Sequence, residues 1–260
     1  MLRTAACLAA IALGAACAPS PAASPGDAPP APTILVFTRT EGFRHDTIPL
    51  AVETLRALAG EAGLAVEHGE DPAAFAPERL ARYRAVAFAL TTGNLLDEAQ
   101  RAAFEAYVRD GGGFLGLHSA ADTGHDWPFY GELVGAWFRS HPPGLQRARV
   151  RFEDPAVEAA HGPWRIEDEL YDFHRNPRPW VRVIATLHER ADGGGMGADH
   201  PIAWCHERLG GRAWYSGLGH DAALYADPVF RAHLLAGLRY VAGTVARCDQ
   251  LSPRRPIMGG

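Results

Sequence analysis

The sequence has little cysteine and no run of basic residues. Four of its 260 residues are cysteine, and two of these, Cys7 and Cys17, lie near the N-terminus. The other two, Cys205 and Cys248, are too few for a disulfide framework and lack zinc-binding spacing, although an oxidising compartment would let them pair. A net charge of -5 without clustered Lys or Arg argues against nucleic acid or an anionic membrane surface as the main partner. Small polar ligands suit this composition better.

Long hydrophobic runs are also missing. The apolar stretch from Ala5 to Ala16 is too short to span a bilayer, and with Arg3 before it the pattern is typical of a secretory signal peptide. The segment Leu13-Gly14-Ala15-Ala16-Cys17 is similar to a bacterial lipoprotein cleavage box. We therefore expect export to the periplasm, with either lipid anchoring at Cys17 or cleavage by the ordinary signal peptidase. The expected parts are a signal peptide (1–17), a flexible Ala/Pro-rich tether (18–32), a folded domain (33–245) and a tail (246–260).

The folded domain begins with alternating strand and helix patterns. Residues Thr33–Thr38 form a continuous apolar run, which is typical of a strand buried on both faces. The spacing of Val52, Leu55 and Leu58 predicts a helix over 48–62. Such alternation predicts a doubly wound, mostly parallel α/β sheet. Further strands are expected at Leu64–His68, Ala85–Leu90 and Phe114–Leu117, and helices at Pro77–Tyr83 and Asp97–Arg109.

After residue 135 the pattern changes to short strands separated by turns. The pair Gly210-Gly211 is a two-residue hairpin signal, so some of these strands should be antiparallel additions to the sheet. A closing helix is predicted over Pro228–Ala242. The expected strands are Ala148–Phe152, Trp164–Phe173, Val181–Leu187, Pro201–His206 and Arg212–Leu218.

Polar residues follow several of the predicted strands. A glycine-rich turn at 111–113 leads into a buried strand that ends at His118 and Ser119. In open α/β sheets the carboxyl ends of the strands face the ligand crevice. The first strand is followed by a polar turn that ends at His45, and the last by His220. We therefore expect these strand ends to place polar groups in one crevice.

Several longer motifs link the chain to a known family. Over about residues 33–243 the sequence resembles the ThuA-like (trehalose utilisation) family, whose fold is that of class I glutamine amidotransferases, related to flavodoxin. The resemblance implies an association with sugar utilisation and does not define one reaction. The motifs that carry it are Gly42-Phe43-Arg44-His45, the run Gly111–Ala120, Asp122, Ser140-His141-Pro142, Asp168–Tyr171, His200–Trp204 and Gly211–His220.

The resemblance also bears on catalysis. In amidotransferases the end of the fourth strand holds a nucleophilic cysteine, whereas this chain has His118 there, so glutaminase chemistry is not expected. We expect His118 and His220 to exchange protons with a sugar or sugar derivative. Ser119 is a weaker candidate nucleophile because it lacks a Gly-x-Ser-x-Gly elbow. The candidate substrate-binding residues are Arg44, His45, Thr92, Asp122, His141, Glu169, Tyr171, His200 and Trp204.

Two questions stay open at this level. Histidines and carboxylates within the motifs would suit a divalent transition metal, but no short ligand motif such as HExxH occurs, and the sequence favours a metal-free acid/base site. The second question is whether the protein is an enzyme. A non-catalytic, carbohydrate-binding lipoprotein is the alternative to an exported enzyme, and the sequence makes no prediction of oligomeric state.

Overall fold

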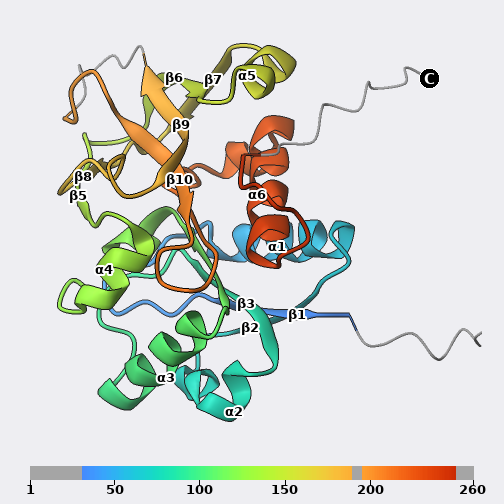
Figure 1. Cartoon of the computed structure of the whole chain (residues 1–260). Coiled ribbons are helices and arrows are strands. Elements are labelled where there is room, and N and C mark those ends of the chain that lie inside the picture. Colours follow the sequence, from blue (N-terminus) through green and yellow to red (C-terminus); the bar gives the residue numbers. More distant parts are fainter. Residues whose placement is uncertain (1–30, 189–194, 250–260) are drawn as a thin grey trace, which may run out of the picture. The chain divides into compact units, whose positions relative to one another are not determined.

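One large sheet organises the part of the chain that the structure, a computed structural model, describes: residues 31–188 and 195–249. Nine strands lie in the order β2-β1-β3-β4-β11-β10-β9-β6-β7, and helices pack on both faces of the parallel strands (Figure 1). The predicted α/β class is thus confirmed. The strands are β1 (Thr33–Phe37), β2 (Ala65–Gly69), β3 (Tyr83–Ala89), β4 (Gly113–Leu117), β6 (Gln146–Phe152), β7 (Trp164–Asp168), β9 (Arg182–His188), β10 (Pro201–His206) and β11 (Ala213–Ser216).

The parallel part of the sheet contains β2, β1, β3, β4 and β11. In its middle, Ala87 of β3 aligns with Leu115 of β4, which aligns in turn with Trp214 of β11. These side chains are almost fully buried, as expected for apolar runs covered on both faces. Phe88 of β3 contacts aromatic rings from five neighbouring elements, namely Phe37, Phe75, Phe104, Phe114 and Tyr130.

Helices cover the two faces of the parallel strands. In Figure 1, α1 and α6 lie on one face and α2 and α3 on the other. A capping box between Asp97 and Gln100 begins α3, and the Asp227 carboxylate accepts hydrogen bonds from the first turn of α6. The predicted helix Pro77–Tyr83 is shorter than expected because Tyr83 already belongs to β3. The helices are α1 (Ile48–Glu61), α2 (Pro77–Leu80), α3 (Glu98–Arg109), α4 (Pro128–Val134), α5 (Pro155–His161) and α6 (Pro228–Val241), with 3-10 turns η1 (Pro72–Phe75), η2 (His118–Asp122) and η3 (Ala222–Ala226).

The predicted antiparallel additions are present beyond β11. Strands β10, β9, β6 and β7 pair antiparallel in that order. The hairpin between β10 and β11 exists, but its connection is longer than the predicted two residues. Gly210 adopts a φ of 104° there, and a Cβ atom on it would meet the backbone oxygen of Arg109 at the end of α3. Close contact with α3, and not only the turn itself, therefore explains this glycine.

The predicted single strand over Trp164–Phe173 is wrong. It divides into β7 and β8 (Asp172–Phe173), and β8 pairs with β5 (Phe138–Ser140) in a separate two-stranded sheet. The chain leaves the large sheet at Asp168, whose carboxylate is engaged by two backbone amides of another loop. The break places Glu169 outside any strand, at the candidate site.

A disulfide joins Cys205 of β10 to Cys248 after α6. The sequence had left this pairing open.

Within the residues that the structure describes, none of the helices is long and apolar enough to cross a membrane. The predicted signal peptide, Cys17, most of the tether and the end of the tail lie outside the described residues.

Candidate functional site

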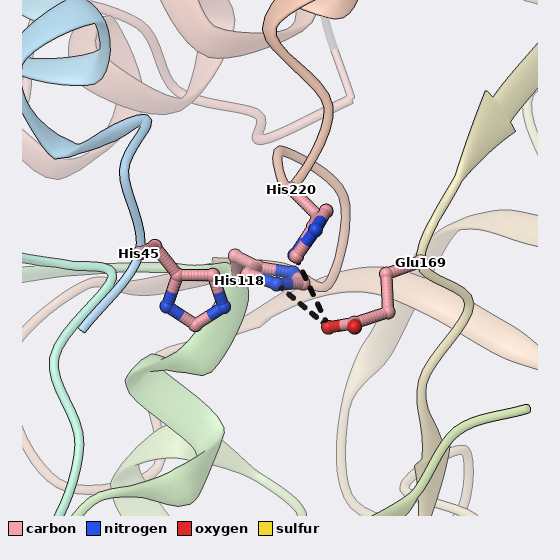
Figure 2. A group of neighbouring side chains, drawn as sticks. All are labelled: His45, His118, Glu169 and His220. Atoms are coloured by element: carbon pink, nitrogen blue, oxygen red, sulfur yellow. Dashed lines mark ion pairs between the residues drawn. The ribbon is translucent and has the colours of Figure 1, made fainter. Parts of the chain in front are cut away.

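Four side chains from distant parts of the sequence meet at the carboxyl edge of the parallel strands. His45 lies in the loop after β1, His118 follows β4, Glu169 follows β7 and His220 follows β11 (Figure 2). One ligand-type atom from each residue lies within 4.8 Å of those of the other three. His45, His118 and His220 thus lie close together at one edge of the sheet, as their positions after the strands predict.

The backbone turns sharply at His118. This residue has a φ of 51°, which is uncommon for a non-glycine residue, and its side chain is fully buried. Two contacts hold the turn: the Tyr215 hydroxyl donates to the backbone oxygen of His118, and the His118 Nδ1–H donates to the backbone oxygen of Gly217 2.9 Å away. Strained conformations of this kind occur at functional sites, where surrounding contacts compensate for their cost.

The hydrogen bond to Gly217 determines the tautomer of His118. A carbonyl oxygen only accepts, so the proton of the neutral ring lies on Nδ1 and the lone pair on Nε2. That Nε2 lies 3.3 Å from Oε2 of Glu169, and His220 Nδ1 lies at the same distance from the same oxygen. Among the described residues, neither nitrogen has a hydrogen-bond partner.

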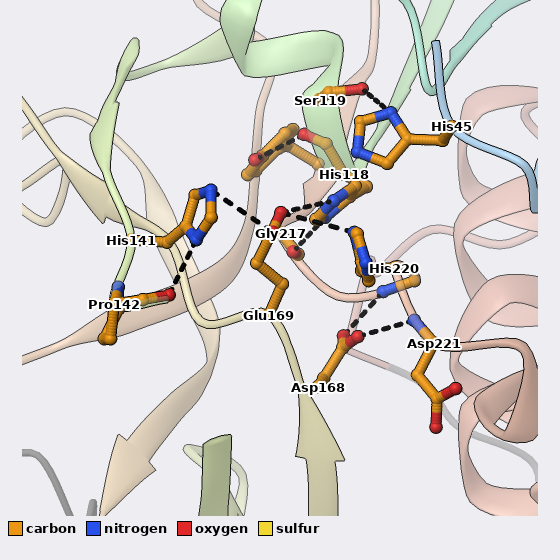
Figure 3. A network of polar contacts seen from close by, with 12 residues as sticks. His45, His118, Ser119, His141, Pro142, Asp168, Glu169, Gly217, His220 and Asp221 are labelled. Carbon is orange, nitrogen blue, oxygen red and sulfur yellow. Dashed lines mark hydrogen bonds and ion pairs between the residues drawn. The ribbon is translucent and has the colours of Figure 1, made fainter. Parts of the chain in front are cut away.

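Glu169 is the centre of the polar network drawn in Figure 3. His141 approaches its other oxygen, with Nε2 3.2 Å from Oε1, while the His141 Nδ1–H donates to the Pro142 carbonyl. Burial favours the neutral acid, but the imidazoles of His118 and His220 hold the pKa of Glu169 well below its usual range. The Glu169 carboxylate in turn raises the pKa of His220. Three imidazoles thus surround one ionised carboxylate.

His45 completes the cluster on the side of β1. Its ring centroid lies 4.8 Å from that of His118 and 5.2 Å from that of His220. Its Nδ1 is 3.4 Å from the Ser119 hydroxyl. Burial, together with the neighbouring His118 and His220, lowers the pKa of His45 to about 3, so this imidazole is neutral and carries a free lone pair.

Asp168 supports the cluster from behind, and the sequence did not single it out for a role of its own. Its buried carboxylate accepts 2.8 Å hydrogen bonds from the backbone amides of Gly219 and Asp221, the two neighbours of His220 (Figure 3). Gly219 has a φ of 121°, which favours glycine. Asp168 therefore fixes the loop that presents His220. Its position next to Glu169, in a motif already noted, was the available signal.

A cavity of about 210 Å³ adjoins the cluster. Phe43, at its mouth, is 67% exposed, which is unusual for a large aromatic side chain. A larger cavity, of about 380 Å³, lies between α2 and α3 far from these groups, and its lining includes none of the cluster residues. The smaller cavity is therefore the candidate substrate site. Its lining residues are Phe43, His45, Thr92, Ser119, Asp122, Phe138, His141, Glu169 and Tyr171.

Five predicted site residues do not line this cavity, and two of them, His118 and His220, belong to the cluster beside it. Arg44 points to β2, where it forms an ion pair with Glu70. His200 is buried behind Tyr171 and donates to its backbone oxygen. Trp204 is a core residue whose indole donates to the carbonyl of Val134. The other predicted residues of the domain line the cavity, and these are His45, Thr92, Ser119, Asp122, His141, Glu169 and Tyr171.

Comparison with known proteins adds information on the family and fold. A sequence profile of the ThuA family, described as trehalose utilisation, matches residues 33–241. None of the curated proteins compared matches the sequence. A ThuA-like protein from Bacteroides uniformis superposes with a TM-score of 0.61 at 21% identity, covering 84% of this chain and 95% of the other. A ThuA-like protein from Parabacteroides merdae gives 0.66 at 18% identity, covering 88% and 94%. At these identities the two structures support the fold alone.

Proposed function

Because the chain belongs to the ThuA (trehalose utilisation) family, we propose that it is an enzyme that processes a sugar or sugar derivative by acid/base chemistry. One observation carries the proposal: a carboxylate contacted by three imidazoles stands at the wall of a cavity at the carboxyl edge of the parallel strands. Ligands of open α/β folds bind at this edge. Binding alone would not require so many titratable groups around one oxygen pair.

The contacts suggest how protons would move. The backbone carbonyls of Gly217 and Pro142 fix the Nδ1–H of His118 and His141, so the Nε2 atoms are the nitrogens free to exchange a proton. Both face Glu169, and His141 also lines the cavity. We assign His141 and the Glu169 centre to proton transfer with bound substrate. Ser119 is a weaker candidate nucleophile, because no Gly-x-Ser-x-Gly elbow surrounds it, although its hydroxyl lies 3.4 Å from His45 Nδ1.

The cavity lining favours an uncharged sugar. Its volume of about 210 Å³ suits a small ligand such as a single sugar ring. Asp122 and Thr92 offer polar atoms for hydroxyl groups, and Phe43 offers an exposed aromatic face for the C–H side of a ring. Among the described lining residues there is no arginine that would pair with a carboxylate or phosphate on the substrate.

We further propose that the protein is exported and anchored at the membrane through Cys17. The apolar leader and the cleavage box support export, and so does the disulfide between Cys205 and Cys248, since such bonds persist mainly in oxidising compartments. Labelling of cells with a radioactive fatty acid tests the anchor. Cys17→Ser should abolish labelling and release the protein into the soluble periplasmic fraction.

The enzymatic proposal is tested with purified mature protein on a panel of glycosides and oxidised sugars. We expect turnover of at least one uncharged sugar derivative, lost in Glu169→Gln. His188→Gln is the matched control, because it also replaces an ionisable side chain with an amide, but on β9, where His188 contacts Thr186. A protein that binds sugars tightly and converts none of them, with Glu169→Gln binding equally well, would support the carbohydrate-binding alternative.

A further inference from the structure

We propose that His45, His118, Glu169 and His220 together bind one divalent first-row transition-metal ion. This is the same site as that of the proposed function. A catalytic role of the ion rests on that proposed function. Binding itself can be measured without any substrate. The inference stands on the ligand spacing, on the direction of two lone pairs and on the contacts behind the ligands.

The spacing of the candidate ligand atoms fits a shared ion. Zinc bonds to imidazole nitrogen and carboxylate oxygen are about 2.0–2.1 Å long, which places neighbouring ligand atoms of a tetrahedron about 3.4 Å apart. His118 Nε2 and His220 Nδ1 each lie 3.3 Å from Glu169 Oε2. The remaining separations reach at most 4.8 Å, so a small rotation of a side chain would close the shell.

The lone pairs converge without hydrogen bonds. The neutral tautomer of His118 directs its Nε2 lone pair at the Glu169 carboxylate, which also only accepts hydrogen bonds when ionised. Two imidazoles approach the same carboxylate oxygen, and within the described structure the His118 Nε2 and the His220 Nδ1 have no hydrogen-bond partner. A metal ion receives several donor atoms from different directions at once. It therefore satisfies this arrangement better than a shared proton.

The contacts behind the ligands are those of a metal site. Ligating histidines usually engage their second ring nitrogen with a carbonyl or another polar group, which fixes the ring. His118 uses Nδ1 in this way on Gly217, and His45 Nδ1 faces the Ser119 hydroxyl. Asp168 holds the loop on both sides of His220. Contacts outside the cluster thus fix the orientation of His118 and the position of His220, as they would for the ligands of a metal ion.

The ligand chemistry selects the class of ion. Three imidazoles and one carboxylate suit zinc, manganese, iron or cobalt, whereas calcium and magnesium prefer oxygen ligands. Such an ion would act as a Lewis acid on an oxygen atom in the adjoining cavity. His141 contacts the other oxygen of Glu169, so it stays outside the ligand set and remains the imidazole that faces substrate.

The test uses full-length mature protein, first analysed for metals as purified and then stripped with chelator. Titration calorimetry with Zn²⁺ and Mn²⁺, and visible absorption with Co²⁺, should each report one ion per chain, and binding should raise the melting temperature. Glu169→Gln and His118→Asn should each weaken binding more than about 100-fold, beyond the loss typical of an outer-shell change. His188→Gln should bind as the parent protein does.

Two results would overturn the inference. One is the absence of binding at millimolar concentrations of all three ions by chelated, folded protein. The other is stoichiometric binding that neither Glu169→Gln nor His118→Asn weakens, because the ion would then occupy another site. Sugar turnover that persists in metal-free protein would leave the proposed enzymatic function standing and remove only the catalytic use of the ion.

Discussion

At the scale of single residues, the neighbours Asp168 and Glu169 divide two tasks. Glu169 presents its carboxylate to three imidazoles, whereas Asp168 turns to the backbone of the loop that carries His220. Burial raises the pKa of Asp168, and the nearby His118 imidazole and hydrogen bonds from backbone amides offset this in part. One acidic side chain therefore serves the site directly and the other positions it.

The role of Asp168 as a positioning residue can be measured. In Asp168→Asn an amide NH₂ group would face a backbone N–H, so one of the two hydrogen bonds is lost and His220 is held less firmly. We expect Co²⁺ affinity to fall by about 10–100-fold with the ligand set intact. Asp71→Asn, which changes a similar carboxylate–amide contact at η1, is the control. Unchanged Co²⁺ affinity and an unchanged absorption spectrum would rule out this role.

His233 predicts a pH dependence of stability that is independent of the site. It is fully buried in α6, and burial lowers its pKa from 6.5 to about 3. Below pH 6.5 the unfolded chain therefore binds a proton that the folded protein excludes, and stability falls as the pH drops toward 3. At pH 5 this single residue accounts for about 2 kcal/mol.

The substitution His233→Gln removes this titration and keeps a group able to contact the Ser216 hydroxyl. Urea unfolding of the parent and the variant at pH 7 and pH 5 gives the comparison. The variant should lose less free energy of unfolding over this interval, by about 2 kcal/mol. Equal losses in the two proteins would mean that His233 takes up its proton in the folded state.

At the scale of elements, the disulfide secures the segment after α6 to β10. It closes a loop with a sequence separation of 43, for which chain entropy predicts about 4 kcal/mol of stabilisation at most. The double variant Cys205→Ser, Cys248→Ser should unfold at a clearly lower urea concentration with little change in cavity residues. Treatment of the parent protein with a reducing agent should lower its midpoint similarly. If neither treatment moves the midpoint, the bond contributes nothing to stability.

Most elements could be predicted because their sequence patterns are local. Apolar runs such as Thr33–Phe37 and the spacing of Val52, Leu55 and Leu58 specify strand and helix without reference to the rest of the chain. The division of 164–173 into β7 and β8 depends on Asp168 meeting a distant loop, and no local pattern announces it. The short helix α5 was missed, although Asp154 followed by Pro155 is a helix-start signal.

Part of the candidate site could also be predicted from local patterns, whereas the contacts between distant residues could not. His45, His118 and His220 each follow a strand, and parallel topology brings such ends together. What the sequence could not give is the arrangement of lone pairs around Glu169 Oε2, because it depends on a hydrogen bond between His118 and Gly217, 99 residues apart. The preference for metal-free chemistry rested on the absence of a short ligand motif.

At the scale of the whole molecule, the tether residues 18–30 should be dispensable for folding, since their composition offers little apolar periodicity to bury. A chain that begins at Ala31 should melt within about 2 °C of the mature protein, a shift no larger than that of a change of about 1 kcal/mol in a domain of this size. A chain that begins at Arg39 lacks β1, which pairs with both β2 and β3, and should fail to fold. A large drop in the melting temperature of the first chain would show that the tether contributes to the fold.

The position of β11 in the sheet also determines when the sheet and the candidate site can form during synthesis. Strand β11 pairs with both β4 and β10, so it joins strands that the chain makes about a hundred residues apart. Until residues 213–216 have been made, β4 presents an open edge, and exposed strand edges favour association with other chains. Strand pairings between distant residues also form slowly. His220 follows β11 directly, so the site can assemble only after nearly the whole chain has been synthesised. A chain cut short before this point keeps the β4 edge open and should be a substrate for chaperones and proteases.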